Sequence, residues 1–208
     1  MAKCGKIVNK ELAMYEKFLK IINNNNGVIT TKEAEKKGIL RVFLKKMTDE
    51  GIIKRIAHGI YATDKFMYDD YYIFELKHSN IIFSHNTALY LHNMTERTPN
   101  KMDITTKRNK NLSSYKDTIN LFRINDNILE LGKCKVKTIY GNTVTTYNLE
   151  RTVCDMIRIK STTDIELTNK SIRKCIKNKN FDANKMFIYA KKMKIFDKVK
   201  NYIEAVIW

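Results

Sequence analysis

The first forty residues alternate between polar stretches and apolar residues at three- and four-residue steps, the spacing of amphipathic helices. A first helix is predicted over residues 11–22, where the apolar face consists of Tyr15, Phe18, Leu19 and Ile22. Thr30 and Glu33 then have the spacing of a capping box, in which each side chain binds a free backbone amide of the other residue. A second helix of about two turns is therefore predicted after Thr30, ending at Gly38.

A third helix and a hairpin follow directly. The helix is predicted from an apolar stripe at positions i, i+3, i+4 and i+7, namely Leu40, Phe43, Leu44 and Met47. Gly51 stands where a left-handed C-cap belongs. Residues 52–56 and 59–62 are rich in isoleucine and predict two strands joined at His58 and Gly59. Helix, helix, tight turn, helix and hairpin is the order of a winged helix-turn-helix.

This order predicts DNA binding, because a recognition helix needs a polar, cationic face for the major groove and a wing lies over the adjacent backbone or minor groove. The expected DNA contacts lie at the start of the second helix, on the polar face of the third helix and on the wing. They are Thr31, Lys32, Arg41, Lys45, Lys46, Thr48, Lys54, Arg55 and His58. The plainer alternative is that these side chains form only a solvated surface.

The pattern changes after about residue 65, and we therefore predict two domains, 1–65 and 66–208. A helix capped by Asp69 or Asp70 comes first, followed by a short strand at 81–83 and a helix capped by Ser84. Four β-rich stretches follow, and Asn148 then caps another helix. The tail is predicted to be helical. The second-last helix is expected to begin at Asp182, and the last helix is expected to cover about 196–206. The fold class is therefore α+β, a winged helix-turn-helix followed by an α+β domain with a small sheet and a helical C-terminal tail.

Charge supports this division. The chain of 208 residues has a net charge of +17, which favours polyanions and nucleic acid first. Residues 1–65 hold 14 Lys or Arg against 7 Asp or Glu, and residues 151–208 hold 14 against 6, whereas residues 66–150 hold 11 against 9. A Lys- and Asn-rich genome would also raise the charge, but it should spread that charge evenly. The two ends are therefore the candidate contact regions.

One cationic stripe stands out in the tail. Opposite the apolar Ile172, Cys175 and Ile176 lie four cations at helical spacing, namely Lys170, Arg173, Lys174 and Lys177. Like charges at this spacing repel one another, and a solvated helix usually alternates signs. We consider a second polyanion contact and simple codon bias to be equally good explanations.

The residue pattern does not predict an enzyme, a metal site or a cofactor. The four cysteines are far apart, as expected for reduced thiols of a cytoplasmic protein, and the first residues resemble no secretion signal. Ser84 and His85 are adjacent on a predicted helix, so their side chains are expected to point apart.

Glu75 and Lys77 have the spacing of a nuclease motif but lie in a predicted helix rather than a strand. Arg151 and Asp155 form either a surface pair or the polar anchor of their helix.

Five segments together resemble the AbiEi-type antitoxin family of bacterial type IV toxin–antitoxin systems. They are "GIYATD", "DDYYIFEL", "SHNTALYLHNMTERTPNKMDITT", "GNTVTTYNLERTVCDMIR" and "IFDKVKNYIEAV", in this order behind the predicted winged helix. The resemblance implies that the N-terminal domain represses its own operon by binding inverted repeats in double-stranded DNA. It also implies that the C-terminal domain antagonises an AbiEii-type nucleotidyltransferase toxin without a stable complex. The family's basic DNA contacts correspond here to Arg41, Lys45, Lys46, Lys54 and Arg55.

Two other functions remain open at this stage. A ligand-responsive transcription factor would need a concave apolar pocket in the C-terminal domain. A nuclease-like immunity protein would need clustered carboxylates and a metal ion. No apolar run is long enough to cross a membrane. Because no heptad repeat is visible, we expect a monomer that pairs on DNA.

Overall fold

The computed structural model describes the backbone of residues 2–159 and 165–207, and the side chains of 12–159 and 165–205. The fold is α+β, as predicted, with two compact units, Met1–Lys77 and His78–Trp208. Each unit is described by itself below. Among the described residues, no helix combines the length and the apolar character that a membrane crossing requires.

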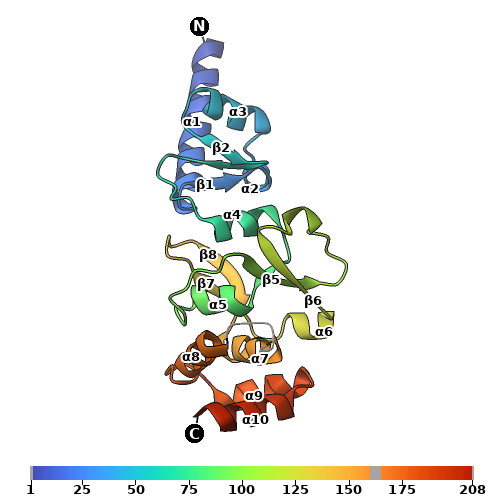
Figure 1. Cartoon of the computed structure of the whole chain (residues 1–208). Coiled ribbons are helices and arrows are strands. Elements are labelled where there is room, and N and C mark those ends of the chain that lie inside the picture. The colour runs from blue at the N-terminus through green and yellow to red at the C-terminus, as the bar shows by residue number, and fades with distance from the viewer. Residues whose placement is uncertain (1, 160–164, 208) are drawn as a thin grey trace. The chain divides into compact units, whose positions relative to one another are not determined.

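The first unit is a winged helix (Figure 1). Its elements are α1 (Ala2–Asn24), β1 (Val28–Thr30), α2 (Thr31–Lys36), α3 (Arg41–Asp49), β2 (Lys54–Ala57), β3 (Ile60–Ala62) and α4 (Asp70–Lys77). The capping box is present, because the Thr30 hydroxyl accepts from the Glu33 amide at 3.1 Å and the Glu33 carboxylate accepts from the Thr30 amide at 3.0 Å. Gly51 follows α3 with φ +72°, the left-handed conformation predicted for it.

The core of this unit corrects one predicted position. Leu44 and Met47 of α3 are buried, as expected, and pack with Phe18 and Ile22 of α1. Leu40, predicted as the start of the apolar stripe, is instead the N-cap of α3 and is 65% exposed. Ile39 occupies the core in its place, because the turn after α2 points this residue inward before the helix begins.

Strand β1 was not predicted. It pairs antiparallel with β3, so the sheet has three strands in the order β1-β3-β2 rather than a hairpin alone. Three residues are too short for an alternation to be recognised, and the pairing partner lies about thirty residues away along the chain. The predicted hairpin itself is present, with Gly59 at φ +69° in its turn.

The boundary between the units lies at Lys77, later along the chain than the predicted boundary at residue 65. The reason is α4, which packs on the first sheet. Ile73 of α4 is buried with Val28 of β1 and with Ile60 and Ala62 of β3. The buried Asp69 caps this helix by accepting from the Tyr72 amide at 3.2 Å, one of the two caps that the sequence allowed.

The second unit contains a five-stranded sheet and several helices. Its strands are β4 (Ile82–Phe83), β5 (Met102–Lys107), β6 (Ile119–Ile124), β7 (Lys133–Lys137) and β8 (Thr143–Tyr147), in the order β6-β5-β4-β8-β7. β5 and β6 are parallel, as are β4 and β8, and the other pairs are antiparallel. All four predicted β-rich stretches are strands, and a turn with Gly141 at φ +80° joins β7 to β8.

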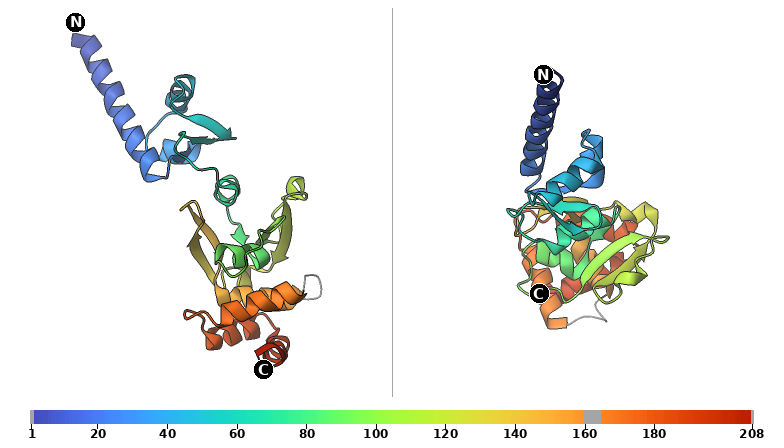
Figure 2. Two further views of the ribbon diagram at one scale, coloured as in Figure 1. Left: turned by 60° about the vertical axis from the view of Figure 1, so that its left-hand side comes forward. Right: turned by 90° about the horizontal axis from the view of Figure 1, so that it is seen from above.

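The described helices of the second unit are α5 (His85–Leu91), α6 (Asp126–Leu129), α7 (Leu149–Ile159), α8 (Ile165–Ile176), α9 (Ala183–Lys192) and α10 (Phe196–Ile207), with a 3₁₀ turn η1 (Ser113–Tyr115). Four of these helices, α5, α8, α9 and α10, pack against α7 (Figures 1 and 2). Asn148 and Asp182 cap α7 and α9 as predicted. The predicted helical tail is present, although the side chain of Val206, inside the predicted last helix, lies outside the described residues. Neither α6 nor η1 was predicted.

Candidate nucleic-acid interface

α3 exposes a cationic face because its apolar face is fixed in the core. Leu44 and Met47 are no more than 2% exposed, so the opposite side of the helix lies in solvent. Arg41, Lys45 and Lys46 are all exposed on it. No side chain caps the first turn of α3, so its free backbone amides lie beside Arg41. The start of α3 therefore combines two kinds of group that bind phosphate, cationic side chains and free backbone amides.

The polar side chains of α3 differ in how far they are already engaged. The Arg41 guanidinium forms an ion pair with Glu35 of α2, and both side chains are largely exposed. An exposed pair of this kind is worth about 1 kcal/mol or less, so a phosphate can replace the carboxylate. Thr48 donates its hydroxyl proton to the Leu44 carbonyl at 2.8 Å. Thr48 can therefore offer DNA only an acceptor while this bond lasts.

The wing holds its cations in two different arrangements. The Lys54 ammonium lies 2.7 Å from the Asp64 carboxylate, and both groups are exposed. A guanidinium nitrogen of Arg55 lies 2.9 Å from Nδ1 of His58. Because a guanidinium only donates, His58 accepts at Nδ1 and carries its proton on Nε2, which is left as a donor. Arg55 and His58 thus form one polar pair at the tip of the wing.

A groove of about 420 Å³ joins the wing to α2 and the start of α3. The predicted residues that line it are Thr31, Lys32, Arg41, Arg55 and His58. Thr31 joins α2 to the turn of the wing, because its amide donates to the Gly59 carbonyl at 2.8 Å. Lys77 of α4 also lines the groove and was not predicted, since α4 had been assigned to the other domain.

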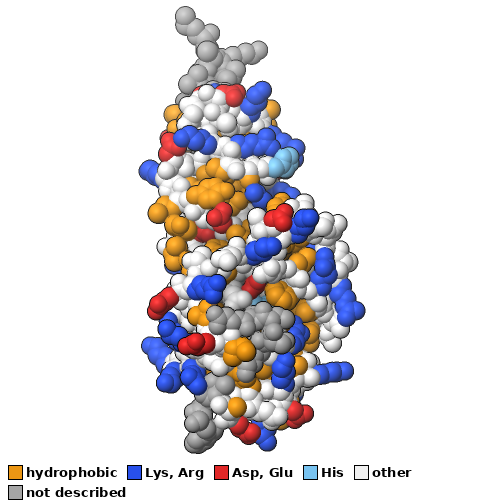
Figure 3. Space-filling model, viewed as in Figure 1, with side chains coloured by type: hydrophobic (Ala, Val, Ile, Leu, Met, Phe, Trp, Pro, Cys, Tyr) orange, Lys and Arg blue, Asp and Glu red, His pale blue; other side chains and the backbone are white. Residues whose placement is uncertain are grey.

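Figure 3 shows Lys and Arg side chains gathered, with a histidine among them, on the upper part of the view, where the first unit is drawn. Of the nine predicted residues, five line the groove, and Lys45, Lys46 and Thr48 continue along α3. Lys54 lies on β2 beside Asp64. The structure thus places all nine on adjoining elements of one unit, and their contact with DNA stays a prediction.

The cationic stripe in the tail has the predicted geometry. Ile172 and Cys175 are fully buried on the inner side of α8. The exposed residues on the outer side are Lys170, Arg173, Lys174 and Lys177. The stripe is therefore a surface feature of the second unit, and its contact with a polyanion stays a prediction.

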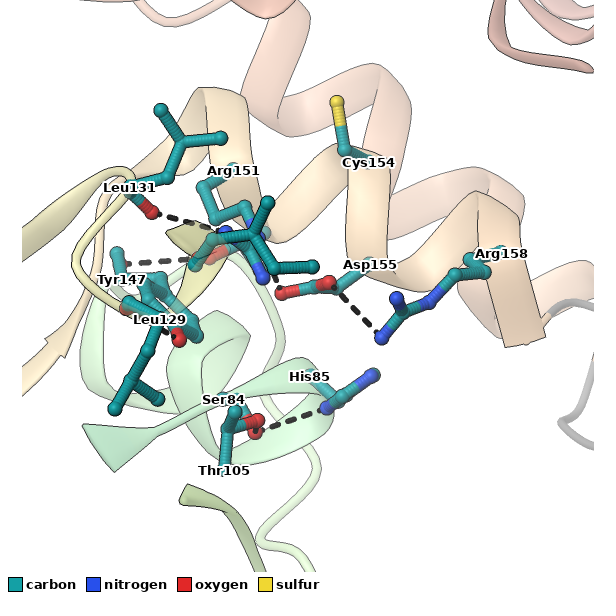
Figure 4. A network of polar contacts seen from close by, with 12 residues as sticks. Ser84, His85, Thr105, Leu129, Leu131, Tyr147, Arg151, Cys154, Asp155 and Arg158 are labelled. Carbon is teal, nitrogen blue, oxygen red and sulfur yellow. Dashed lines mark hydrogen bonds and ion pairs between the residues drawn. The ribbon is translucent and has the colours of Figure 1, made fainter. Parts of the chain in front are cut away.

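A buried polar network fixes α7 in the second unit (Figure 4). The fully buried Arg151 donates to the Asp155 carboxylate at 3.0 Å and to the carbonyls of Ile128 and Leu131 at 2.7 and 3.1 Å. Its guanidinium carbon also lies 4.4 Å from the centre of the Tyr147 ring. Of the two interpretations of the Arg151–Asp155 pair, the polar anchor is therefore correct and the surface pair is wrong.

The expectation that Ser84 and His85 point apart is wrong. The Ser84 hydroxyl lies 2.9 Å from Nδ1 of His85 and accepts from the Thr105 hydroxyl at 2.8 Å (Figure 4). The side chains meet because Ser84 is extended and His85 has a left-handed φ of +47°. Both residues are 0% exposed, so no substrate can reach the pair in this structure. Burial lowers the pKa of His85, an effect that the charge of Asp155 partly opposes.

Ser84 also fails to cap α5 with its side chain, although it occupies the N-cap position as predicted. The capping acceptor is Asp103 of β5, whose carboxylate accepts from the Asn86 amide at 2.9 Å. This contact joins residues 17 apart in sequence, so no local sequence pattern predicts it.

The remaining candidates from the sequence concern metal, nuclease and thiol chemistry. In the part of the chain that the structure describes, no group of three or more His, Cys, Asp or Glu side chains could hold a metal ion. Glu75 and Lys77 lie on α4, in a helix as expected. Cys134, Cys154 and Cys175 are free thiols, and burial raises the pKa of Cys154 and Cys175 to about 12, which leaves them protonated and unreactive. The side chain of Cys4 lies outside the described residues.

Comparisons with known proteins bear on the first unit. Residues 18–63 match the family model AbiEi_4, described as "Transcriptional regulator, AbiEi antitoxin". The match covers the winged helix alone, and over these residues the resemblance to AbiEi-type antitoxins, a family of transcriptional regulators, is confirmed. No curated protein matches the chain. The crystal structure of the RV2827C protein from Mycobacterium tuberculosis is similar, with a TM-score of 0.45 and 11% identity over 86% of this chain and 74% of that chain.

Proposed function

We propose that this chain is the antitoxin and transcriptional autorepressor of a type IV toxin–antitoxin operon, because its winged helix matches the AbiEi antitoxin family model. The observation that carries the proposal is the exposed cationic face of α3, which adjoins a groove lined by Arg41, Arg55 and His58. A helix that presents cations and free amides outward, beside a cationic wing, is suited to double-stranded DNA.

In this proposal α3 enters the major groove of the operator, with Arg41 and Lys45 toward base edges and phosphates. Arg55 and His58 of the wing, with Lys32 of α2, contact the adjacent backbone. Two chains, monomeric in solution, pair on the two halves of an inverted repeat, because a symmetric site requires two copies of one surface. Thr48 contributes less to DNA binding, because its hydroxyl donates to the Leu44 carbonyl of its own helix.

The second unit antagonises an AbiEii-type nucleotidyltransferase toxin in the cytoplasm, without a lasting complex. This division of labour rests on the division of the fold, since each unit has its own core. The alternative of a ligand-responsive regulator predicts an apolar pocket. Two hollows in the described second unit, of about 400 and 600 Å³, are lined by both polar and apolar side chains, so neither is the apolar pocket that this alternative predicts.

The two activities are expected to be separable at Lys77. A chain that begins at His78 keeps the whole core of the second unit and leaves α4 with its partners, whereas one that begins at residue 66 would expose Ile73. The 78–208 chain should stay folded, lose operator binding and still suppress the cognate toxin on co-expression. A folded 78–208 chain that fails to suppress toxicity would show that both activities need the first unit.

The stripe on α8 can be tested by charge reversal. Replacing Lys170, Arg173, Lys174 and Lys177 with glutamate should leave the fold intact, since Ile172 and Cys175 on the buried side are unchanged. If the stripe contacts DNA beside the operator, the salt dependence of binding should become shallower by about 0.9 per lost phosphate contact. If it contacts RNA that the toxin acts on, protection against the toxin should fall. A variant equal to wild type in both assays would leave the stripe as a solvated face.

A further inference from the structure

Three polar residues of the second unit lie between two adjoining hollows. Asn86 of α5, Asp103 of β5 and Asn120 of β6 line both hollows, whose volumes are about 400 and 600 Å³. These volumes are in the usual range for sites that hold a small molecule. The hollows lie wholly within the second unit and contain none of the residues assigned to DNA contact above.

Asp103 fixes the direction in which both amides point. It is 2% exposed, and its carboxylate accepts from the side-chain amide of Asn86 at 3.0 Å and from that of Asn120 at 2.7 Å. An ionised carboxylate can only accept, so each asparagine must turn its NH₂ group toward Asp103. The two amide oxygens are thereby directed away from Asp103 and are available as acceptors at the junction of the hollows.

The walls carry cations. Arg97 and Lys101 line the smaller hollow, and Lys116 and Arg123 line the larger one. The Lys101 ammonium is held in place by the Lys116 carbonyl at 2.9 Å, which ties the two cationic walls together. Among the lining residues, Asp103 is the one acidic side chain, and three hydrogen bonds already occupy its carboxylate. The site therefore attracts anions.

The remaining lining is apolar or carries hydroxyl groups. Leu89, Pro99 and Leu167 line the smaller hollow, together with the hydroxyl-bearing Thr168 and Ser171 of α8. In the larger hollow, the half-buried Phe122 is backed by the ring of His85, with ring centres 3.7 Å apart. A flat apolar group can pack on such surfaces, and an aromatic ring held from behind is a rigid platform for it.

We propose that these adjoining hollows form a nucleotide-binding site. The four cations bind phosphate, the two amide oxygens accept from amino or hydroxyl groups of the base and ribose, and the apolar walls pack against the base. A nucleotide unites in one molecule the negative charge, the hydrogen-bond donors and the flat ring that the three parts of the site require. The nucleotide comes either free or as part of a single-stranded RNA, since both carry the same chemistry.

The proposal is tested by calorimetric titration of the full chain with the four ribonucleoside triphosphates, a ten-nucleotide single-stranded RNA and inorganic tripolyphosphate. At least one triphosphate or the RNA should bind saturably and more tightly than tripolyphosphate. Binding of the triphosphates alone identifies a free nucleotide, and binding of the RNA alone identifies a strand. No saturable binding, or tripolyphosphate binding as tightly as every nucleotide, would overturn the proposal.

Variants locate the binding. Arg97→Ala with Lys101→Ala should weaken nucleotide binding by about tenfold or more, because charge-assisted hydrogen bonds are lost. Arg108→Ala with Lys135→Ala removes the same charge from residues that line neither hollow and should have no effect. Asn120→Leu removes the amide oxygen and the hydrogen bond to Asp103 but keeps all four cations, so it should weaken nucleotide binding while leaving tripolyphosphate unchanged. Arg41→Ala with Lys45→Ala alters the first unit alone and should bind nucleotide as wild type does. Equal binding by the Arg97/Lys101 variant and by wild type would place the nucleotide elsewhere and end the proposal.

Discussion

Replacing Arg151 with methionine is expected to lower the free energy of unfolding of the second unit by about 3–5 kcal/mol, the usual cost of removing one partner from a buried ion pair. The side chain is fully buried, and its loss leaves the Asp155 carboxylate with only Arg158, at 3.6 Å. The carbonyls of Ile128 and Leu131 lose their donor at the same time. Chemical denaturation followed by circular dichroism measures the change.

The double variant Arg151→Met with Asp155→Leu is the control for lost packing. It removes the stranded charge together with its partner, so it should recover part of the lost stability. The first unit has its own core, so a separate transition of that unit should not move. A single variant within about 1 kcal/mol of wild type would mean that the network does not anchor α7.

Replacing both Arg41 and Lys45 with alanine is expected to weaken operator binding by about 2–6 kcal/mol, if each side chain makes a base or phosphate contact worth about 1–3 kcal/mol. Part of the Arg41 contribution is offset in wild type, because its ion pair with Glu35 must first open. Fluorescence anisotropy at fixed salt measures the effect, since ionic strength itself changes affinity steeply.

A matched control is available on α1. Lys17 and Lys20 are exposed cations of the same unit, and changing both to alanine removes the same amount of charge from a different helix. That variant should lose far less affinity than the α3 variant. Similar losses in the two variants would indicate a general electrostatic attraction rather than a recognition helix.

Local signals in the sequence were sufficient for much of the first unit. The capping box at Thr30 and Glu33, the glycine after α3 and the hairpin at Gly59 are each encoded by residues within a few positions of one another, and all three are present. Leu40 was placed wrongly because the apolar spacing of α3 extends to this residue, one position before the helix begins at Arg41.

Long-range contacts account for what the sequence did not predict. β1 exists because it pairs with β3, and α4 belongs to the first unit because Ile73 packs on that sheet. In the second unit, the carboxylate that caps α5 comes from β5. The left-handed backbone of His85, which brings it to Ser84, is likewise maintained by the surrounding fold and not by a glycine at that position. The candidate DNA contacts were predictable because their helix and wing are local, whereas Lys77 was not.

A nuclease-protection footprint of the full chain on the DNA upstream of its own gene shows whether the first unit reads an operator. We expect two protected half-sites in an inverted repeat, separated by about one helical turn of 10–10.5 base pairs or a multiple of it. The protection should be lost in the Arg41/Lys45 variant and kept in the Lys17/Lys20 variant. No protection of the upstream DNA, or equal protection of a shuffled sequence, would mean that the first unit does not read an operator.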